Sequence, residues 1–329
     1  MVDVLICGAG AIGSFFGYLL SELEKGDPVE NVALLGRESH ILQIKKSGLR
    51  ISLFKEIKCI RFKHCYSRLD QLASSDFHPS IAVVCVKTLS LSSLQNDLQN
   101  SGLLNDGLKD VSFILLMNGM GNKENFALPP HQVFEGITSI GVIFPEDGLI
   151  ELKGVGDTLI EEGIALELKQ FMREQLAEKG FEIEFLRDFK RHQWAKLFAN
   201  AVINPLTALT GEKNGIVLSE AFERTVEFIV EECVGVARQE GMDFDKERVL
   251  EMVRSIAEKT SQNTSSMLQD IQRGKRTEID SINGYVIGLG HRHRIAVKVN
   301  ETLYSLVKAK EAKYPDPQGD ALSALDIDY

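Results

Sequence analysis

Three polar residues, Lys196, Asn200 and Asn204, recur every four positions in an otherwise apolar stretch. At about 100° of rotation per residue, their side chains lie within roughly 80° of one another on a helix. A cationic lysine can hydrogen-bond a ketone oxygen, stabilise the developing alkoxide and deliver a proton to it, and desolvation would ease that transfer by lowering the lysine pKa. The residues alone support equally a solvent-facing lysine with capping asparagines, because we expect Pro205 to bend or end the helix.

A second set of residues has the spacing of a dinucleotide-binding turn. The pattern GxGxxG follows an apolar strand and opens a helix, in Gly8, Ala9, Gly10, Ala11, Ile12 and Gly13. The first glycine permits a tight turn, the second lets a pyrophosphate approach the backbone, and the third allows close packing of helix and strand. The helix N-terminus then favours the phosphates. The alternative is a glycine-rich packing turn without a ligand.

The end of the second strand predicts which dinucleotide binds. NAD sites usually place Asp or Glu there, to bond the ribose 2′-hydroxyl. Here Val32–Leu35 runs into Gly36 and Arg37, and an arginine can pair with a 2′-phosphate through its planar fork. We therefore expect NADP(H), with Arg37 on the 2′-phosphate. The alternatives are a solvated arginine and a ribose contact from Glu38.

Further polar residues stand where ligands meet such folds, but each also has a purely structural explanation. Asn118 and Lys87 follow apolar strands, on the side of a doubly wound sheet where ligands bind. Asn-Gly is equally a turn signal, and Lys87 equally a solvated strand end. Glu278 is explained by a helix start with Thr277 as N-cap, and Ser266 by an exposed helix position.

The elements that position these residues change character along the chain. Four continuous apolar runs predict strands buried on both faces of a parallel sheet: Val2–Cys7, Val32–Leu35, Ile81–Val86 and Phe113–Met117. Leu49–Phe54 and Ile57–Phe62 alternate more and predict an exposed antiparallel ribbon. Further strands are expected at Gln132–Phe144, Leu149–Ile160 and Glu182–Leu186.

After Arg187 the pattern is helical, with long helices expected at Ala221–Glu240 and Arg248–Ile271. Helix breaks are expected at Gly241, Gly274 and Gly290, and a tail marked by Pro315 and Pro317. We therefore predict an α/β protein: a Rossmann-like dinucleotide-binding domain over residues 1–187, followed by an all-helical substrate and catalytic domain over residues 188–329. Ligands in such proteins tend to draw residues from both domains.

Composition excludes several classes of protein. The 329 residues are 44% hydrophobic and 26% charged, as in ordinary globular proteins, and the net charge of −10 disfavours binding to nucleic acids or anionic membranes. Five cysteines without a CxxC pair indicate a reducing cytoplasm and neither a disulfide scaffold nor a metal site. Glycines interrupt the uncharged Val4–Ser21 stretch, which we interpret as strand, turn and helix and not as a targeting segment. His291–Arg294 is interpreted as a surface loop.

The downstream motifs carry a resemblance that covers nearly the whole chain. They occur in one order: Gly8–Gly13, Cys85–Lys87, Asn118–Gly121, Trp194–Leu197, Asn200–Ala208, Asn214–Gly215, Ser265–Asp270, Arg276–Asp280 and Asn283–Gly284. With these motifs the chain resembles the ketopantoate reductase (2-dehydropantoate 2-reductase) family, the NADPH-dependent enzymes of pantothenate synthesis. The resemblance implies reduction of 2-dehydropantoate to (R)-pantoate, in a Rossmann-like domain followed by a helical one.

The resemblance also implies roles for single residues. Lys196 matches the family's proton donor, and Glu278 the glutamate at the junction of cofactor and substrate. The remaining matches are substrate or cofactor contacts: Asn200, Asn204 and Asn214 to the substrate, Ser266 to its carboxylate, Asn118 to both ligands, and Val142 to the cofactor. The segments Ser21–Asn31 and Leu49–Phe62 and the strands around Ile143 match poorly, which leaves the adenosine side and any homodimer contacts open.

Two other functions remain open from the sequence. One is a reductase of a different 2-keto acid, because the pocket lining cannot be read from the residues. The other is an NADP(H) sensor that signals to a partner. The set of Lys196, Asn200, Asn204 and Glu278 argues against the sensor, since a sensor needs no proton donor.

Overall fold

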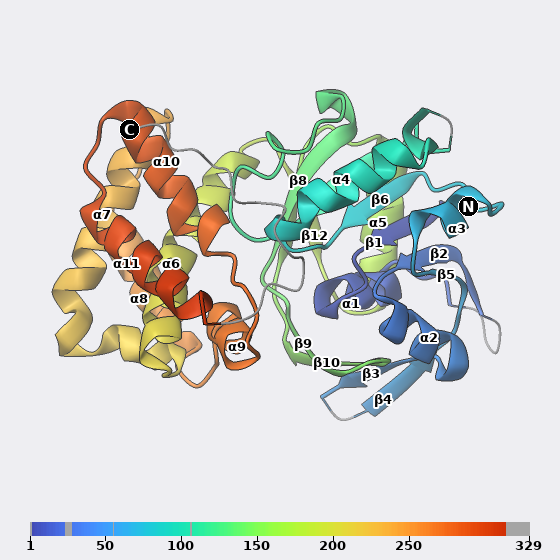
Figure 1. Cartoon of the computed structure of the whole chain (residues 1–329), viewed down its shortest axis with the longest axis horizontal. Helices are drawn as coiled ribbons and strands as arrows, with labels where there is room; N and C mark the ends of the chain where they lie inside the picture. Colours follow the sequence, from blue (N-terminus) through green and yellow to red (C-terminus); the bar gives the residue numbers. More distant parts are fainter. Residues whose placement is uncertain (1, 24–27, 55, 106, 314–329) are drawn as a thin grey trace. The chain divides into compact units, whose positions relative to one another are not determined.

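The computed structural model describes residues 2–23, 28–54, 56–105 and 107–313. The chain divides into two compact units, Met1–Lys190 and Arg191–Tyr329 (Figure 1). The first contains all the strands of the described part of the chain, and the second is helical. This is the α/β architecture with a Rossmann-like first domain and a helical second domain that the sequence predicts.

An eight-stranded sheet forms the centre of the first unit, in the order β12-β11-β8-β7-β6-β1-β2-β5. Neighbouring strands are parallel except for β8 and β11. The strands are β1 (Val4–Cys7), β2 (Val29–Leu35), β5 (Phe62–Tyr66), β6 (Ile81–Val84), β7 (Ser112–Leu116), β8 (Val133–Thr138), β11 (Thr158–Glu161) and β12 (Ile183–Leu186). The four apolar runs predicted as buried parallel strands are confirmed as β1, β2, β6 and β7.

Helices cover both faces of this sheet (Figure 1). Successive residues of β1 alternate between two cores: Val4 and Ile6 pack in one, and Leu5 and Cys7 in the other. The first core includes residues of α1 (Ala11–Leu19), α2 (Glu38–Ser47) and α5 (Leu166–Glu178). The second includes residues of α3 (Leu69–Ala73) and α4 (Leu91–Asn100). A strand with an apolar layer on each side has no polar positions, which explains its continuous apolar sequence.

A four-stranded sheet in the order β4-β3-β10-β9 packs against the first core. Its strands are β3 (Leu49–Leu53), β4 (Glu56–Ile60), β9 (Gly141–Glu146) and β10 (Leu149–Gly154). The predicted antiparallel ribbon is confirmed in the pairing of β3 with β4. Exposure is limited to its outer strand: Ile57 on β4 is 70% exposed, whereas Ile51 on β3 is fully buried, because β3 also pairs with β10.

The two longest predicted strands are wrong, because each is split between the two sheets. Gln132–Phe144 contains β8 and β9, and Leu149–Ile160 contains β10 and β11. Where the chain changes sheets, the Ser139 amide donates to the Asp157 carbonyl at 2.9 Å. A Cβ on Gly156 would lie 2.6 Å from the Ser139 carbonyl oxygen, so glycine permits this close approach.

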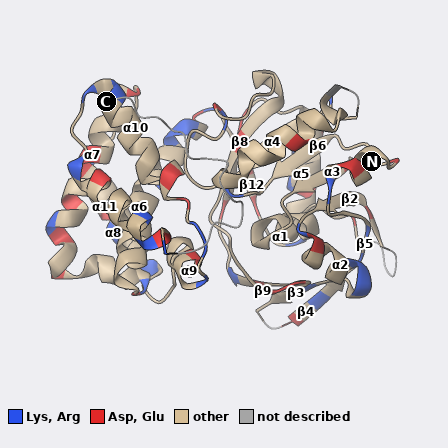
Figure 2. Cartoon of the chain, viewed as in Figure 1, with Lys and Arg blue, Asp and Glu red and all other residues tan. Residues whose placement is uncertain are grey.

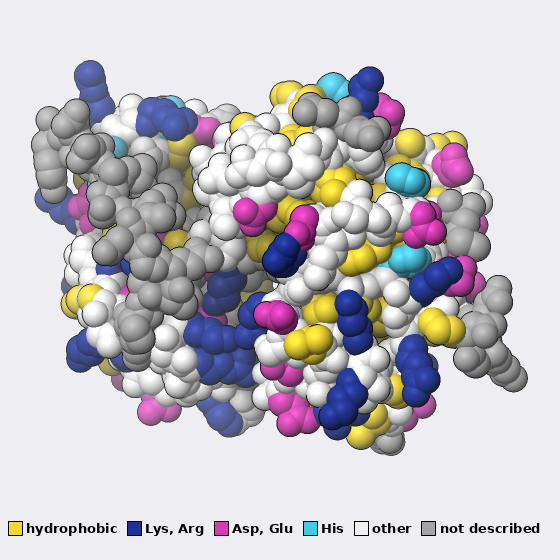
Figure 3. Space-filling view, turned by 45° about the vertical axis from the view of Figure 1, so that its right-hand side comes forward, with side chains coloured by type: hydrophobic (Ala, Val, Ile, Leu, Met, Phe, Trp, Pro, Cys, Tyr) yellow, Lys and Arg dark blue, Asp and Glu magenta, His cyan; other side chains and the backbone are white. Residues whose placement is uncertain are grey.

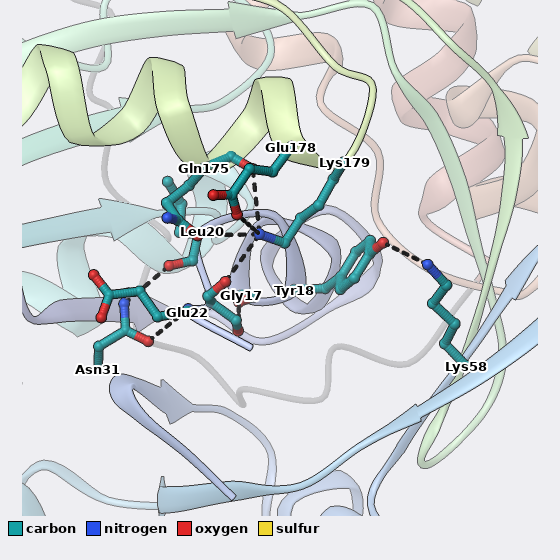
Figure 4. A network of polar contacts seen from close by, with 10 residues as sticks. Gly17, Tyr18, Leu20, Glu22, Asn31, Lys58, Gln175, Glu178 and Lys179 are labelled. Atoms are coloured by element: carbon teal, nitrogen blue, oxygen red, sulfur yellow. Dashed lines mark hydrogen bonds and ion pairs between the residues drawn. The ribbon is translucent and has the colours of Figure 1, made fainter. Parts of the chain in front are cut away.

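A network of polar contacts fixes the C-terminal end of α1 (Figure 4). The buried ammonium of Lys179 donates to the Ser21 carbonyl at 2.9 Å and to the Gln175 side chain at 3.1 Å. The buried Asn31 amide donates to the Leu20 carbonyl at 3.0 Å. A helix leaves its last carbonyls unpaired, and a cation there is favoured by the helix dipole. The helix that follows the glycine turn is therefore held at its far end.

The second unit consists of α6 (Phe189–Thr210), α7 (Glu223–Gln239), α8 (Lys246–Lys259), α9 (Ser266–Gln272), α10 (Asn283–His293) and α11 (Lys298–Glu311). Short 3₁₀ turns precede two of them: η4 (Asn214–Leu218) and η5 (Glu220–Phe222) come before α7, and η6 (Ile279–Ser281) comes before α10. Figure 2 shows acidic and basic residues interspersed along α7 and α8. Ile229 on α7 and Val253 on α8 are fully buried.

Four expectations about these helices are corrected or lie outside the described residues. Arg248–Ile271 is not one helix, because Ser265 accepts a hydrogen bond from the Leu268 amide and so begins α9. Gly290 lies inside α10, where a Cβ would meet both methyls of Val297 at 2.9 Å; it permits close packing and does not break the helix. His291 and His293 form the last turn of α10 and not a loop. Pro315 and Pro317 lie outside the described residues.

The surface mixes charges of both signs. Figure 3 shows acidic, basic and apolar side chains close together on the face drawn. In the part of the chain that the structure describes, no helix combines the length and the apolar character needed to cross a bilayer.

Candidate active site

The glycine-rich turn lies between β1 and α1 and is held against the end of β2. The amides of Gly8 and Ala9 both donate to the Leu35 carbonyl at 2.9 Å, and Gly8 has a φ of +97°. The Gly10 amide donates to the Gly8 carbonyl at 2.7 Å. No side chain caps the N-terminus of α1, which begins at Ala11. The first-turn amides therefore remain for an anionic ligand.

The three glycines of this turn differ in what a side chain at each position would meet. A Cβ on Gly8 would lie 2.7 Å from Val86 Cγ1, and one on Gly13 would lie 2.1 Å from the Gly8 carbonyl oxygen. Both glycines are therefore required by packing. A Cβ on Gly10 would meet no atom within 4 Å. Gly10 faces open space, which is where a phosphate would approach the backbone.

Arg37 stands directly after the end of β2 and precedes α2. Its side chain is exposed, with the guanidinium carbon 5.1 Å from the centre of the Phe144 ring. β2 ends at Leu35 and no carboxylate occupies its tip; Glu38, the neighbour of Arg37, is exposed. A guanidinium stacked on an aromatic ring at this point has the chemistry to bind a phosphate.

His40 is a residue of this region that the sequence analysis missed. It is fully buried on α2, where its Nδ1 accepts from the Gly148 amide at 2.9 Å and its Nε2 lies 3.1 Å from Ser14 Oγ. Because Nδ1 is the acceptor, Nε2 carries the proton and donates to Ser14. Burial lowers the pKa of His40 to about 4, so the ring is neutral. Its two hydrogen bonds connect α2 to α1 and to the turn between β9 and β10. The signal that could have identified His40 in the sequence is a histidine in the amphipathic pattern of a helix.

The loops after β6 and β7 carry two further predicted residues and are joined by one that was missed. Lys87 precedes the short η1 (Thr88–Ser90), and Asn118 follows β7; both are half-buried. Asn122 is 2% exposed, donates to the Asn118 carbonyl at 3.2 Å and accepts from Thr88 Oγ1 at 3.1 Å. Val142, the remaining predicted cofactor contact, is half-buried on β9 and packs against the first core.

In the second unit, α6 carries the three residues at spacing four. Lys196 and Asn200 are half-buried and Asn204 is 6% exposed. Burial lowers the pKa of Lys196 to about 8, and the nearby Glu278 carboxylate opposes that shift. The helix does not end at Pro205 but continues to Thr210, so all three polar residues belong to one helix.

Glu278 is held by the residues on either side of it. The amide and hydroxyl of Thr277 donate to Glu311 Oε1, with the amide at 2.7 Å. Asp280 accepts from Tyr304 at 2.7 Å and from Lys308 at 3.1 Å. Thr277 does not cap a helix here, because Glu278 itself precedes the short η6 and α10 begins only at Asn283. These contacts over long sequence distances are absent from any local pattern.

Asn214, the first residue of η4, contacts the segment between α8 and α9, and Ser266 is the first residue of α9. The Asn214 side chain donates to Thr260 Oγ1 at 3.0 Å, whereas its buried Oδ1 has no partner among the described residues. A buried acceptor of this kind suits a ligand hydroxyl. Ser266 is exposed at the start of α9; its neighbour Ser265 is buried, lying 2.6 Å from Thr207 Oγ1 on α6.

The structure thus brings Lys196 close to Glu278, and Asn200 and Asn204 onto the same helix, within the second unit. Within the first unit, the glycine turn lies against the end of β2, from which Arg37 follows. The residues of the first unit are those of a dinucleotide-binding fold. The residues of the second unit belong to a helical unit with a half-buried lysine.

Comparisons with known proteins agree with this arrangement. Residues 4–163 match the family model described as ketopantoate reductase PanE/ApbA, and residues 188–311 match the model of its C-terminal domain. A 2-dehydropantoate 2-reductase of Pyrococcus horikoshii is 33% identical over 319 residues, with 94% of this chain and 98% of the relative covered.

Solved structures show the same fold. A PanE/ApbA family ketopantoate reductase from Ralstonia eutropha matches with a TM-score of 0.82 at 27% identity, covering 95% of this chain and 99% of that one. A D-mandelate dehydrogenase in complex with NADH matches with a TM-score of 0.79 at 25% identity, covering 95% and 100%. The family matches and the relatives, which extend over nearly the full length, place this chain in the ketopantoate reductase (PanE/ApbA) family, whose members are dinucleotide-dependent reductases.

Proposed function

We propose that this protein reduces 2-dehydropantoate to (R)-pantoate with NADPH, a step of pantothenate synthesis. One observation carries the proposal: a half-buried lysine on α6 whose pKa is lowered by burial to about 8, against the opposing influence of the Glu278 carboxylate, in a chain whose relatives are 2-dehydropantoate 2-reductases. Reduction of a ketone needs a proton donor for the developing alkoxide. Lys196 has the charge and the pKa for that role.

Bound NADPH supplies the hydride. The first-turn amides of α1 and the open position at Gly10 would hold its pyrophosphate. Arg37 would pair with the 2′-phosphate, which NADH lacks. We assign further contacts with the dinucleotide to Lys87, Asn118, Val142 and Glu278.

Lys196 holds a proton at Nζ in the resting enzyme. With a pKa of about 8, roughly nine-tenths of the side chain is protonated at pH 7. The ammonium would donate a hydrogen bond to the keto oxygen and then release its proton to the alkoxide. Glu278 supports the charged form between turnovers.

Substrate orientation is assigned to the polar residues around α6. Asn200 and Asn204 would bind the substrate from the lysine's own helix, and Asn214 would use its unpaired Oδ1 for a substrate hydroxyl. Ser266, at the first position of α9, would hold the carboxylate, and Asn118 would contact substrate as well as cofactor. We assign the dinucleotide to residues 1–187 and the substrate to residues 188–329.

Two broader expectations go with this function. Pantothenate synthesis and the free thiols of the five cysteines fit a reducing cytoplasm. A homodimer is the assembly we expect, and light scattering of the purified protein tests it.

Absorbance at 340 nm tests the proposal directly. We expect NADPH to be consumed on addition of 2-dehydropantoate, with a higher kcat/KM than for other 2-keto acids such as phenylglyoxylate and pyruvate. A higher kcat/KM for another keto acid would favour a relative with a different substrate. Tight NADPH binding without turnover of any keto acid would favour the sensor.

A further inference from the structure

Pro205, in the middle of α6, cannot donate the helical hydrogen bond that the Ala201 carbonyl would otherwise accept. In a helix the amide of residue 205 would donate to the carbonyl of Ala201, but proline has no amide hydrogen. The helix nevertheless continues to Thr210, and both residues are buried. A buried carbonyl without a donor costs about 1–3 kcal/mol, so another group has to supply the hydrogen bond.

Asn283 supplies it from the start of α10. Its Nδ2 donates to the Ala201 carbonyl at 3.0 Å and to Asn300 Oδ1 at 2.9 Å. Both partners are acceptors, so the orientation of the amide is fixed. Asn283 is fully buried, and its own Oδ1 has no partner within the described residues. The Asn283 amide nitrogen therefore donates two hydrogen bonds, whereas its amide oxygen accepts none from the described residues. This indicates that the side chain is positioned as a donor.

Asn300 is itself held in place. Its Nδ2 donates to Glu232 Oε2 at 2.7 Å, and its backbone amide donates to the same oxygen at 3.0 Å. The amide of Val299 donates to the other oxygen of Glu232 at 2.9 Å. One hydrogen-bond network therefore joins the first turn of α11, Glu232 on α7 and the start of α10. Asn283 connects that network to α6.

The two residues joined by this bond are near candidate site residues in the sequence. Ala201 stands between Asn200 and Asn204, and Asn283 follows Glu278 by five residues. We propose that Asn283 is a positioning residue, which replaces the hydrogen bond missing at Pro205 and so fixes the Lys196 face of α6 relative to the Glu278 segment. This role in catalysis rests on the proposed function.

Kinetics of Asn283→Ala test the catalytic part. We expect kcat/KM for the keto acid to fall about 10- to 100-fold, because a small displacement of the reacting groups has effects of this size. KM for NADPH should change less than kcat/KM for the keto acid, because the glycine turn belongs to the other unit and Glu278 is the one assigned dinucleotide contact in this unit. Pro205→Ala restores an amide donor at position 205, so the double variant should recover most of the lost kcat/KM. A loss of folded protein alone would lower the apparent kcat in proportion and leave KM for the keto acid unchanged.

Thermal unfolding tests the structural part without any activity. Asn283→Ala should lower Tm by about 4 °C or more in the parent chain, and by less than half of that in the Pro205→Ala background. Asn31→Ala is the matched control: Asn31 also donates to a buried backbone carbonyl at 3.0 Å, but shares no partner with Pro205. Its Tm loss should be the same in both backgrounds.

Three results overturn the proposal: equal Tm losses for Asn283→Ala in both backgrounds, no recovery of kcat/KM in the double variant, or a kcat/KM for Asn283→Ala equal to that of the parent. If Asn283→Ala does not fold, the double variant decides, because we expect it to fold, and its failure to fold would also overturn the proposal. If the parent chain does not reduce 2-dehydropantoate, the proposed function fails, whereas the Tm cycle still tests the link between Asn283 and Pro205.

Discussion

Two opposed influences act on the proton of Lys196. Burial lowers its pKa to about 8, and the Glu278 carboxylate limits the fall. An ordinary lysine, with a pKa near 10.4, would release its proton less readily. The sequence predicted this lysine and its two asparagines because their spacing is local. It did not predict the contact of Asn283 with Ala201 or that of Thr277 with Glu311, which join residues 82 and 34 positions apart.

Replacing Glu278 with glutamine tests the balance at Lys196. In the proposed mechanism protonated Lys196 is the proton donor, so kcat for reduction should fall as the pH rises through its pKa. Without the carboxylate that pKa should decrease, and the alkaline fall of kcat should move to lower pH by about 1 unit. Glu251→Gln, an exposed change on α8, serves as the control and should leave the profile in place. An unchanged profile for Glu278→Gln would mean that the carboxylate does not act on the lysine.

Arg37→Ala tests the choice of dinucleotide. Loss of the charged hydrogen bonds to the 2′-phosphate should lower kcat/KM for NADPH about 10- to 100-fold. The value for NADH should change little, since NADH has no group for Arg37 to bind. The exposed Arg61 provides the matched control in Arg61→Ala. Equal losses with both dinucleotides would contradict the assignment.

At the scale of elements, the sequence predicts best where burial is uniform. β1 and β6, and β2 from Val32 and β7 from Phe113, are continuous apolar runs because both faces of the sheet are covered. β8 and β9 are also apolar, but they belong to different sheets, and no local pattern marks the change at Ser139. Pro205 does not end α6, and the local sequence could not show this, because the compensating donor comes from α10.

Two glycines of the turn before α1 should respond differently to alanine. Gly13→Ala should lower the free energy of unfolding by about 2 kcal/mol or more, because its Cβ would meet the Gly8 carbonyl oxygen. Gly10→Ala should change it by less than about 0.5 kcal/mol, since its Cβ has open space, yet it should weaken NADPH binding. Chemical denaturation and NADPH titration measure the two effects. Tight NADPH binding by Gly10→Ala would show that the pyrophosphate lies elsewhere.

His40 should make the stability of the first unit depend on pH. Its pKa of about 4 in the folded chain lies below the ordinary 6.5, so its contribution is complete above pH 6.5 and is lost as the pH falls toward 4. The loss amounts to at most about 3 kcal/mol. Unfolding free energies at pH 7 and pH 4.5 should differ less in His40→Asn than in the parent chain. His131→Asn, at an exposed position, should retain the parent's difference; an unaltered difference in His40→Asn would contradict the assignment.

At the scale of the whole molecule, the chain combines a Rossmann-like unit with a helical unit that carries the proposed proton donor. Family membership, the glycine turn and the row of Lys196, Asn200 and Asn204 on one helix were predictable from the sequence, because each is carried by a motif. The strand order and the buried network around Asn283 were not, because they depend on which segments meet after folding. Catalysis in this account requires both units.

The most direct test of the account compares Lys196→Ala with the parent enzyme in the NADPH-dependent reduction of 2-dehydropantoate. We predict a fall in kcat of about 100- to 10,000-fold, the contribution of a general acid, with NADPH affinity retained. Lys190→Ala, an exposed lysine on the same helix, should keep the parent's kcat. A Lys196→Ala variant that reduced the keto acid at the parent's rate would contradict the account.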